Sequence, residues 1–308
     1  SEIIAAFVER GIKLCVQGGL IGAISSRTPF YQVSTSQWRM DVVIPSNISL
    51  FVELGGGVLD SAMVETVMYV LGCGRNDAPA VFSVSSAEEF QKESRILKNS
   101  SEQLFAVDLR RFHVIPGCPF AYWLSPIMLA CLESLPTLED VNIKVRVGLQ
   151  SGDDFRFMRL WWEVPGNLDG WVAHAKGGEN SPYYSDIHLV VNWDGHGHEV
   201  KAQPSVRLNM YSGVNPGLYM VPVLTFSYRT FRFSPAILPG NCIAGVAGMG
   251  VFTDSFDLNF LSAILNSSVA NSFISARLNR REMESLYQAG VVGPTPFASF
   301  SEDAKKEL

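Results

Sequence analysis

Hydrophobic and polar positions in the first quarter of the chain follow patterns that predict part of an α/β sheet. Apolar residues recur at helical spacing over 1–16, which predicts a helix. Apolar runs at 20–26, 48–57 and 64–71 are each typical of a buried strand. A further helix is expected at 36–43. The last two strands are close enough along the chain to pair antiparallel, so the segment predicts half of a sheet rather than a whole one.

The pattern changes after these strands. Residues 72–100 are richer in Gly, Ser and charge, which favours a linker with a little structure. From about 101, short apolar runs interleave with Arg, Pro and aromatic residues, as in strands separated by turns. Helices are expected at 125–133 and 258–278. The chain opens in a helix and stops where Ser301 would cap another, so we expect a piece of a longer protein.

Composition narrows the class of protein. The 308 residues are 47% hydrophobic and carry a net charge of −6. They predict about two domains, argue against wholesale disorder and exclude a generally basic nucleic-acid binder, although not local basic strips. Five cysteines without a CxxC pair fit buried free thiols in a reducing, cytoplasmic setting. The longest apolar run, 119–136, is too short to span a membrane and is expected to be a buried helix.

Several motifs that could carry chemistry have simpler explanations. His196 and His198 lie two residues apart, but no cluster of cysteines or carboxylates completes a metal site nearby, and a hairpin turn is favoured. The glycine-rich segments 55–57 and 245–250 match neither a dinucleotide-binding loop nor a phosphate-binding loop. No GxSxG motif and no evident Cys–His pair supports a hydrolase.

The stretch GLQSGDDFRFMRLWWEVP at 148–165 combines acids, arginines and a Trp-Trp pair. Its two adjacent acids, Asp153 and Asp154, could bind a metal, but a turn after Gly152 is favoured. Its aromatic residues are expected to belong to the core, namely Phe155, Phe157, Trp161 and Trp162.

Three groups of segments, taken in order, resemble a known family. The first joins AFVERGIKLCVQGGLIGAISSRTPF to LFVELGGGVLDSAMVETVMYVL. The second joins PFAYWLSP, GLQSGDDFRFMRLWWEV, AKGGE and VVNWDGHGHEVK, and the third is YQAGVVGPTPF. The ordered set resembles the bacterial DNA adenine-N6 methyltransferases of the large restriction-modification type, including the PglX (BREX) methyltransferases. The resemblance covers nearly all of the chain.

This resemblance implies a domain organisation and an α/β fold. Residues 1–75 would be the later half of a Rossmann-like catalytic domain, beginning just before its fifth strand, and 76–100 a linker. Residues 101–292 would form a mixed α+β target-recognition domain, and 293–308 the start of a truncated helical segment. The implied partners are double-stranded DNA, the missing N-terminal half of the methyltransferase and further defence-system subunits such as a nuclease. No membrane partner is expected.

The resemblance also defines what this chain lacks. The family binds S-adenosylmethionine on a glycine-rich loop and holds the flipped adenine with an Asn-Pro-Pro-Tyr/Phe loop, and neither motif occurs here. Methyl transfer needs the base extruded from the duplex and held in line with the methyl donor. We therefore expect that the full-length parent uses S-adenosylmethionine, whereas this chain alone has no cofactor, no metal, no catalytic residue and no activity.

In the family, the border of the base pocket corresponds to Ser25, Arg27, Phe30, Leu59 and Asp60 of this chain. An aromatic residue is common at the position of Leu59, where a ring can stack on the extruded base. Leu59 offers apolar contact only, and an ordinary packing role at the end of a strand remains open for it.

Basic residues interleaved with aromatic residues in the second domain are candidates for DNA contacts, because Arg and Lys bind phosphates and Arg can read guanine. They are Arg156, Arg159, Lys176, Arg207, Arg229 and Arg232. Gly177 follows Lys176 and suits a close approach of the backbone. If SYRTFRFS is a strand, two of these arginines lie on opposite faces unless a bend intervenes. Any one of them could instead be a solvated surface charge.

Two other classes of function remain open. The chain could be a non-catalytic specificity or interaction subunit that works with a separate catalytic chain. It could also be a β domain that binds a sugar or another small ligand, an interpretation that rests only on exposed aromatic residues.

Overall fold

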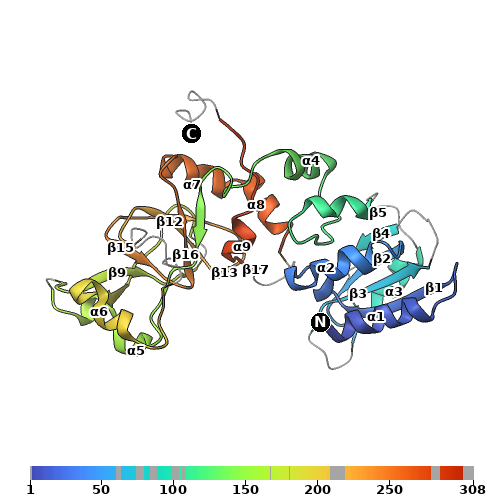
Figure 1. The fold of residues 1–308 in the computed structure, drawn as a ribbon, viewed down its shortest axis with the longest axis horizontal. Helices are drawn as coiled ribbons and strands as arrows, with labels where there is room; N and C mark the ends of the chain where they lie inside the picture. The colour runs from blue at the N-terminus through green and yellow to red at the C-terminus, as the bar shows by residue number, and fades with distance from the viewer. Residues whose placement is uncertain are drawn as a thin grey trace. The chain divides into compact units, whose positions relative to one another are not determined.

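The computed structural model describes residues 2–59, 64–73, 80–83, 89–98, 104–105, 108–166, 168–179, 181–208, 219–278 and 285–300. The chain divides into two compact units, Ser1–Glu133 and Ser134–Leu308. Figure 1 shows a mixture of helices and strands in each unit, and each unit is described here by itself.

Unit 1 contains the helices and strands that the sequence predicts for the first quarter of the chain. In chain order they are α1 (Glu2–Leu14), β1 (Leu20–Ser26), α2 (Ser36–Trp38) continuing as a π-helical turn (Arg39–Val43), β2 (Ile48–Gly55), β3 (Thr66–Gly72), β4 (Ala80–Ser83), α3 (Glu89–Lys98), β5 (Leu104–Phe105) and α4 (Pro126–Ser134). Single 3-10 turns lie at Thr28–Phe30 and Val33–Thr35, and a longer one at Leu109–Val114.

These strands form one sheet in the order β1-β3-β2-β4-β5. Strand β3 lies between β1 and β2 and is antiparallel to both, as the sequence predicts for the last pair. Strand β4 is parallel to β2, and β5 is antiparallel to β4. Since β1 and β2 both oppose β3, they run parallel to each other and their carboxyl ends lie at the same edge of the sheet.

The core of unit 1 is built from aromatic rings of distant segments. Phe30 is completely buried, and its ring centroid lies 5.2 Å from that of Phe51, 5.0 Å from that of Tyr69 and 5.3 Å from that of Phe120. Three of these four rings come from β2, from β3 and from the loop after β1. Phe120 comes from the segment before α4, so this segment packs onto the sheet of unit 1.

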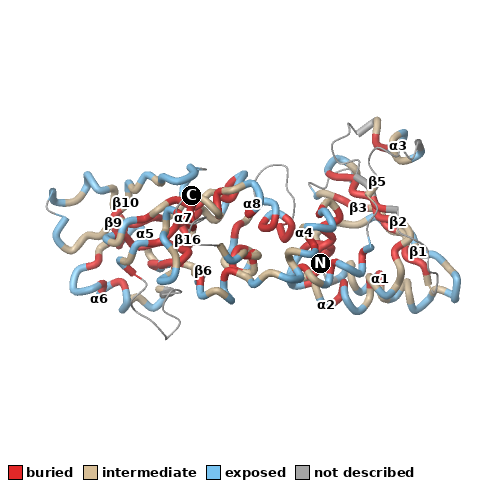
Figure 2. The backbone as a smooth tube through the Cα atoms, turned by 90° about the horizontal axis from the view of Figure 1, so that it is seen from above, coloured by how far each residue is buried: buried red, intermediate tan, exposed pale blue. Residues whose placement is uncertain are grey.

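Two expectations about unit 1 need correction. Strand β1 is not buried, because it lies at the edge of the sheet and alternate side chains face solvent; Figure 2 shows α1 and β1 in tan and pale blue, whereas β2 and β3 are mostly red. The apolar run 119–136 is not a buried helix. Most of its buried residues, including Phe120 and Tyr122, lie before α4; on α4 itself Leu129 is buried, but Ile127 is exposed.

The expected linker carries regular structure, since β4 and α3 both fall within 76–100. Residues 108–133, which the sequence places in the second domain, belong to the first compact unit. The functional boundaries at 75, 100 and 292 stay a prediction. Among the helices of the described residues, none is long and apolar enough to cross a membrane.

Unit 2 consists of short strands and helices. In chain order they are β6 (Lys144–Arg146), β7 (Leu149–Gln150), α5 (Asp154–Phe157), β8 (Met158–Leu160), a 3-10 turn (Trp161–Glu163), β9 (Trp171–Ala175), β10 (Leu189–Asn192), α6 (Asp194–Ala202), β11 (Arg207–Leu208), β12 (Val223–Ser227), β13 (Arg229–Thr230), β14 (Ala236–Leu238), β15 (Cys242–Ala244), β16 (Gly248–Phe252), α7 (Leu258–Asn266), α8 (Ser268–Ser275), β17 (Ser285–Leu286) and α9 (Ala289–Val292).

Two four-stranded sheets organise this unit, with the orders β15-β9-β10-β8 and β14-β12-β16-β6. Strands β11 and β7 form a separate pair, and so do β13 and β17. One apolar core joins β12 and β16 to α7 and α8, and a second core lies around Phe157, Val191 and Ile243.

Two local predictions in unit 2 were wrong in detail. The helix expected over 258–278 is two helices, because Ser267 has an extended conformation and its hydroxyl accepts a hydrogen bond from the backbone N–H of Ala270 at the start of α8. The segment around His196 is not a hairpin but the start of α6. There Gly195, His196 and Gly197 adopt positive φ angles before the chain continues as a helix.

Candidate functional site

The residues expected at the border of a base pocket gather at one edge of the unit 1 sheet. Ser25 and Arg27 lie at the carboxyl end of β1, and Leu59 follows the glycine turn at the carboxyl end of β2. In open α/β sheets, ligands bind at the edge where the carboxyl ends of parallel strands meet. Asp60 lies outside the described residues.

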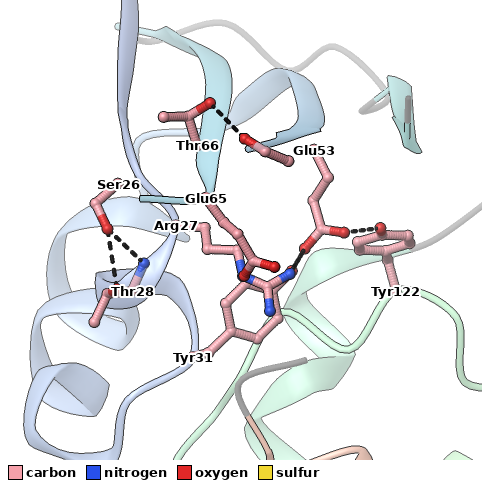
Figure 3. Close-up of polar contacts among 9 residues, drawn as sticks. Ser26, Arg27, Thr28, Tyr31, Glu53, Glu65, Thr66 and Tyr122 are labelled. Atoms are coloured by element: carbon pink, nitrogen blue, oxygen red, sulfur yellow. Dashed lines mark hydrogen bonds and ion pairs between the residues drawn. The ribbon is translucent and has the colours of Figure 1, made fainter. Parts of the chain in front are cut away.

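Arg27 is buried at this edge and is held by two carboxylates (Figure 3). Its Nε lies 2.6 Å from Glu65 Oε2, and its Nη1 lies 3.3 Å from Glu53 Oε1. Its backbone N–H also donates to the Glu65 carbonyl at 3.0 Å. Because both acids compete with any other anion for this guanidinium, Arg27 is suited to fixing the loop after β1 rather than to binding a phosphate.

Glu53 connects this loop to the segment before α4. The Tyr31 hydroxyl donates to Glu53 Oε1 at 2.5 Å, and the Tyr122 hydroxyl donates to Oε2 at 2.6 Å (Figure 3). All three side chains are buried. Burial, followed by the charge of Glu53, raises the pKa of Tyr31 well above its ordinary value, so Tyr31 stays a hydrogen-bond donor.

A second buried cation, Arg39, also holds the loop after β1. Its Nε donates to the Cys118 carbonyl at 2.7 Å and its Nη1 to Thr35 Oγ1 at 2.8 Å. It also donates to the carbonyls of Pro29 and Gly117. Burial lowers the pKa of Arg39 to about 10, which leaves it charged at neutral pH. The loop after β1 is therefore tied to residues 117–118 by one side chain.

Phe30 and Leu59 differ in what they can offer a ligand. Phe30 is enclosed by other rings and has no exposed surface, so it supports this edge from the core. Leu59 is exposed, and an apolar contact with a base is open to it. The role of the whole set as a pocket border stays a prediction.

Both β1 and α1 expose apolar side chains. On β1 these are Leu20 and Ile24, and on α1 and its end they are Ile3, Phe7, Leu14 and Val16. Helix α1 lies on the Ile21 side of β1, so Leu20 and Ile24 alternate to the opposite face of the strand. Exposed apolar residues on each side of this edge offer an interaction surface.

In unit 2, the two acids of the 148–165 stretch build a turn, as expected. Asp153 caps α5 by accepting the backbone N–H of Arg156 at 3.1 Å. Asp154 accepts hydrogen bonds from Ser151 Oγ, at 2.5 Å, and from Lys176 Nζ. Lys176 and the Ser151 hydroxyl lower the pKa of Asp154 against the effect of burial.

The two arginines of this stretch, and Lys176 further along the chain, already have partners. Arg156 Nη2 lies 3.5 Å from Glu199 Oε2, with both groups exposed, and Lys176 forms the ion pair with Asp154. Arg159 Nη1 donates to the carbonyls of Phe155, at 2.5 Å, and Met158, at 2.7 Å.

The aromatic residues of the stretch correct the expectation that they form core. Phe157 is buried, but Phe155 is 91% exposed, and Trp161 and Trp162 are more than half exposed. Phe155 lies on the outer side of α5 because the capping by Asp153 and the burial of Phe157 fix the orientation of this short helix.

The fold of unit 2 itself requires a glycine at position 177. Its φ is +91°, and a Cβ at this position would overlap the carbonyl oxygen of Ala247. The close approach expected at Gly177 is therefore an approach of the chain to itself. His174, two residues before Lys176, is buried, and burial together with the nearby Lys176 charge lowers its pKa to about 4. The sequence did not single out this neutral histidine.

The remaining basic candidates lie elsewhere in unit 2. Arg207 lies on β11, where its backbone pairs with Gln150, and its side chain falls outside the described part of the chain. Arg229 and Arg232 are exposed, and β13 ends at Thr230, so a bend separates them rather than a continuous strand. Among the described residues, no group of three or more His, Cys, Asp or Glu could hold a metal ion.

No family model matches the chain. It is 24% identical to the adenine-specific methyltransferase PglX of Lacticaseibacillus casei (strain Zhang), over 89% of this chain and 25% of that protein. It is 23% identical to the adenine-specific methyltransferase BrxX of Escherichia coli O9:H4 (strain HS), over 91% of this chain and 24% of that protein. The resemblance to PglX-type adenine-specific methyltransferases is confirmed.

The chain spans about a quarter of the length of PglX and BrxX. Its fold is similar to that of the type IIL restriction-modification enzyme MmeI, solved in complex with DNA, with a TM-score of 0.62 and 14% identity. That similarity covers 99% of this chain and 43% of MmeI. The mixed α/β class is thus shared with a restriction-modification enzyme as well as predicted from the sequence.

Proposed function

We propose that this chain supplies the end of the catalytic domain and the target-recognition domain of an adenine-specific DNA methyltransferase in a restriction-modification or phage-defence system. The observation that carries the proposal is the similarity to PglX and BrxX along nearly the whole chain. The antiparallel pairing of β2 with β3 supports it, because the resemblance implies a closing antiparallel pair after the fifth strand of a Rossmann-like methyltransferase sheet.

The partner of this catalytic end is the rest of the methyltransferase domain. The exposed apolar residues of α1 and β1 offer it a surface, and the outer edge of β1 offers hydrogen bonds to a further strand. A separate catalytic chain would use the same surface if this protein acts as a specificity subunit. Co-purification with the neighbouring catalytic segment, and its loss in Phe7→Asp, would support either arrangement, whereas retention in Phe7→Asp would count against this surface.

The glycine-rich segment 245–250 does not fit S-adenosylmethionine. The segment 245–250 is filled by its own fold: a Cβ at Gly248 would lie 2.5 Å from the Ala175 carbonyl oxygen and 2.8 Å from the Gly177 nitrogen. It therefore has no room to cradle a nucleoside or a carboxylate. We propose that the cofactor binds to the rest of the parent enzyme and that this chain alone transfers no methyl group.

Unit 2 would bind duplex DNA. Arg229 and Arg232 are the leading contacts, because both are exposed and lie at the bend that follows β13. Arg207 and the Lys176-Gly177 turn remain secondary candidates. Fluorescence anisotropy with a labelled duplex tests this: affinity should fall steeply as salt rises, and Arg229→Gln with Arg232→Gln should weaken binding and flatten the salt dependence.

A methylation assay serves as the control. Incubation of the chain with duplex DNA and labelled S-adenosylmethionine should leave the DNA unlabelled. A chain that binds no duplex DNA at low salt, or that methylates it unaided, contradicts the proposed function.

A further inference from the structure

A phenylalanine protrudes from unit 2 between the two leading arginines. Phe231 is 72% exposed, and Arg229 and Arg232 on either side of it are exposed as well. A single exposed apolar side chain is common on protein surfaces, so the significance of Phe231 comes from its basic neighbours and from its ordered backbone. The sequence places it in SYRTFRFS, where the alternation of a strand would not single it out.

The backbone around Phe231 is fixed before any partner arrives. Thr230 is buried, and its hydroxyl donates to the Arg232 carbonyl at 2.7 Å, which closes the bend. Phe233 is also buried, with its ring centroid 4.9 Å from that of Phe226 and 5.5 Å from that of Tyr287. Phe231 is therefore the outward residue between two anchored neighbours.

Pairing with β17 holds the other side of the bend. Arg229 and Thr230 on β13 pair with Leu286 and Ser285, and the Tyr287 N–H donates to the Tyr228 carbonyl at 2.8 Å. A side chain presented on an ordered backbone loses little conformational freedom on binding.

Arg232 is held at the end of a helix. Its Nη2 donates to the carbonyl of Asn266, the last residue of α7, at 2.8 Å. A cation is favourable at this negative end of the helix dipole. Asn266 is itself anchored, since its Nδ2 donates to the Pro235 carbonyl at 2.8 Å. A guanidinium has five N–H donors, so one such bond positions Arg232 and leaves donors for a phosphate.

We propose that Phe231 is an apolar wedge that enters the base stack of duplex DNA while Arg229 and Arg232 bind phosphates on either side of it. This proposal rests on DNA binding by unit 2. Apolar side chains that insert between base steps unstack them and kink the duplex. Such insertion would ease extrusion of a neighbouring base, which an enzyme acting on a base in a duplex must achieve.

The test compares two short labelled duplexes of the same sequence, one intact and one with a single abasic site. Insertion costs less where stacking is already broken, so the wild-type chain should prefer the abasic duplex. Phe231→Ala should weaken binding to it by about ten- to a hundredfold, as removal of a base-stacking aromatic side chain does, and should abolish the preference. Phe231→Trp should restore both.

The matched control is Tyr184→Ala, which removes an aromatic side chain of similar exposure, 69%, from the same unit. It should keep the wild-type affinity and preference. An unchanged thermal midpoint in Phe231→Ala would show that the bend still folds, as expected for an exposed side chain.

Three outcomes are distinguishable. Loss of the abasic preference in Phe231→Ala alone supports the wedge. Duplex binding with the same preference in Phe231→Ala and in the wild type overturns the wedge, leaves the proposed function standing and points to a protein partner for this bend. Absence of duplex binding by the wild type overturns the wedge together with the proposed function.

Discussion

Replacing Tyr122 by phenylalanine removes one hydroxyl group from the buried network of unit 1 and keeps the ring. That hydroxyl donates to Glu53 Oε2 at 2.6 Å, a length typical of a charge-assisted hydrogen bond. Hydrogen bonds to charged groups contribute about 1.5–3 kcal/mol. Because Tyr31 and Arg27 still contact Glu53, the carboxylate keeps other partners, and we expect unit 1 to lose about 2 kcal/mol.

Native-state hydrogen exchange at the amides of β2 measures this change in unit 1 without interference from unit 2. Tyr228→Phe is the matched control, since the Tyr228 hydroxyl contacts only an exposed amide, Gln288 Nε2, at 3.3 Å in the described part of the chain. It should change stability by no more than about 0.5 kcal/mol. The stabilising role assigned to the Glu53 network is wrong if Tyr122→Phe alters hydrogen exchange in β2 no more than Tyr228→Phe alters hydrogen exchange in unit 2.

Three further substitutions test other parts of the fold. Arg39→Met should destabilise unit 1 by about 3–5 kcal/mol in urea unfolding, because it leaves buried acceptors around Pro29 and Gly117 without their donor; a loss near zero would show that water replaces the guanidinium. Gly177→Ala should cost unit 2 about 2 kcal/mol or more through its positive φ and the overlap with Ala247, seen as a lower thermal midpoint. The folded pKa of His174, about 4, lies below the ordinary value of about 6.5, so the unfolded chain takes up this proton first as pH falls. Stability should therefore be full above about pH 6.5 and decrease by up to about 3 kcal/mol towards pH 4, and a His174→Asn variant that keeps the same pH slope would contradict this.

Local pattern was enough to predict most of the elements of unit 1. Strands β1, β2 and β3 follow from apolar runs bounded by glycine turns, and their antiparallel pairing follows from the short connection between them. The break between α7 and α8 at Ser267 could also have been predicted, because a serine just before a new run of helically spaced apolar residues is a typical helix N-cap. Burial of β1 was predicted wrongly because the order of strands in a sheet is not a local property.

The Glu53 network could not be predicted from spacing. Tyr31 and Tyr122 lie 22 and 69 positions from Glu53, and Arg39 reaches a carbonyl 79 positions away. Phe155, Trp161 and Trp162 were misjudged for another reason. Aromatic residues are usually buried, and only the capped geometry of α5 shows that Phe155 points outward.

The exposed edge of β1 has a consequence for the behaviour of this chain in solution. The seven residues of β1, which include the exposed Leu20 and Ile24, bond to β3 on one side only, so alternate backbone donors and acceptors face outward without a second neighbouring strand among the described residues. Such an edge can pair with its copy in another molecule and seed aggregation. Colloidal stability of the purified chain should therefore improve when this edge is covered, and Ile24→Lys should reduce light scattering without altering β2 or β3.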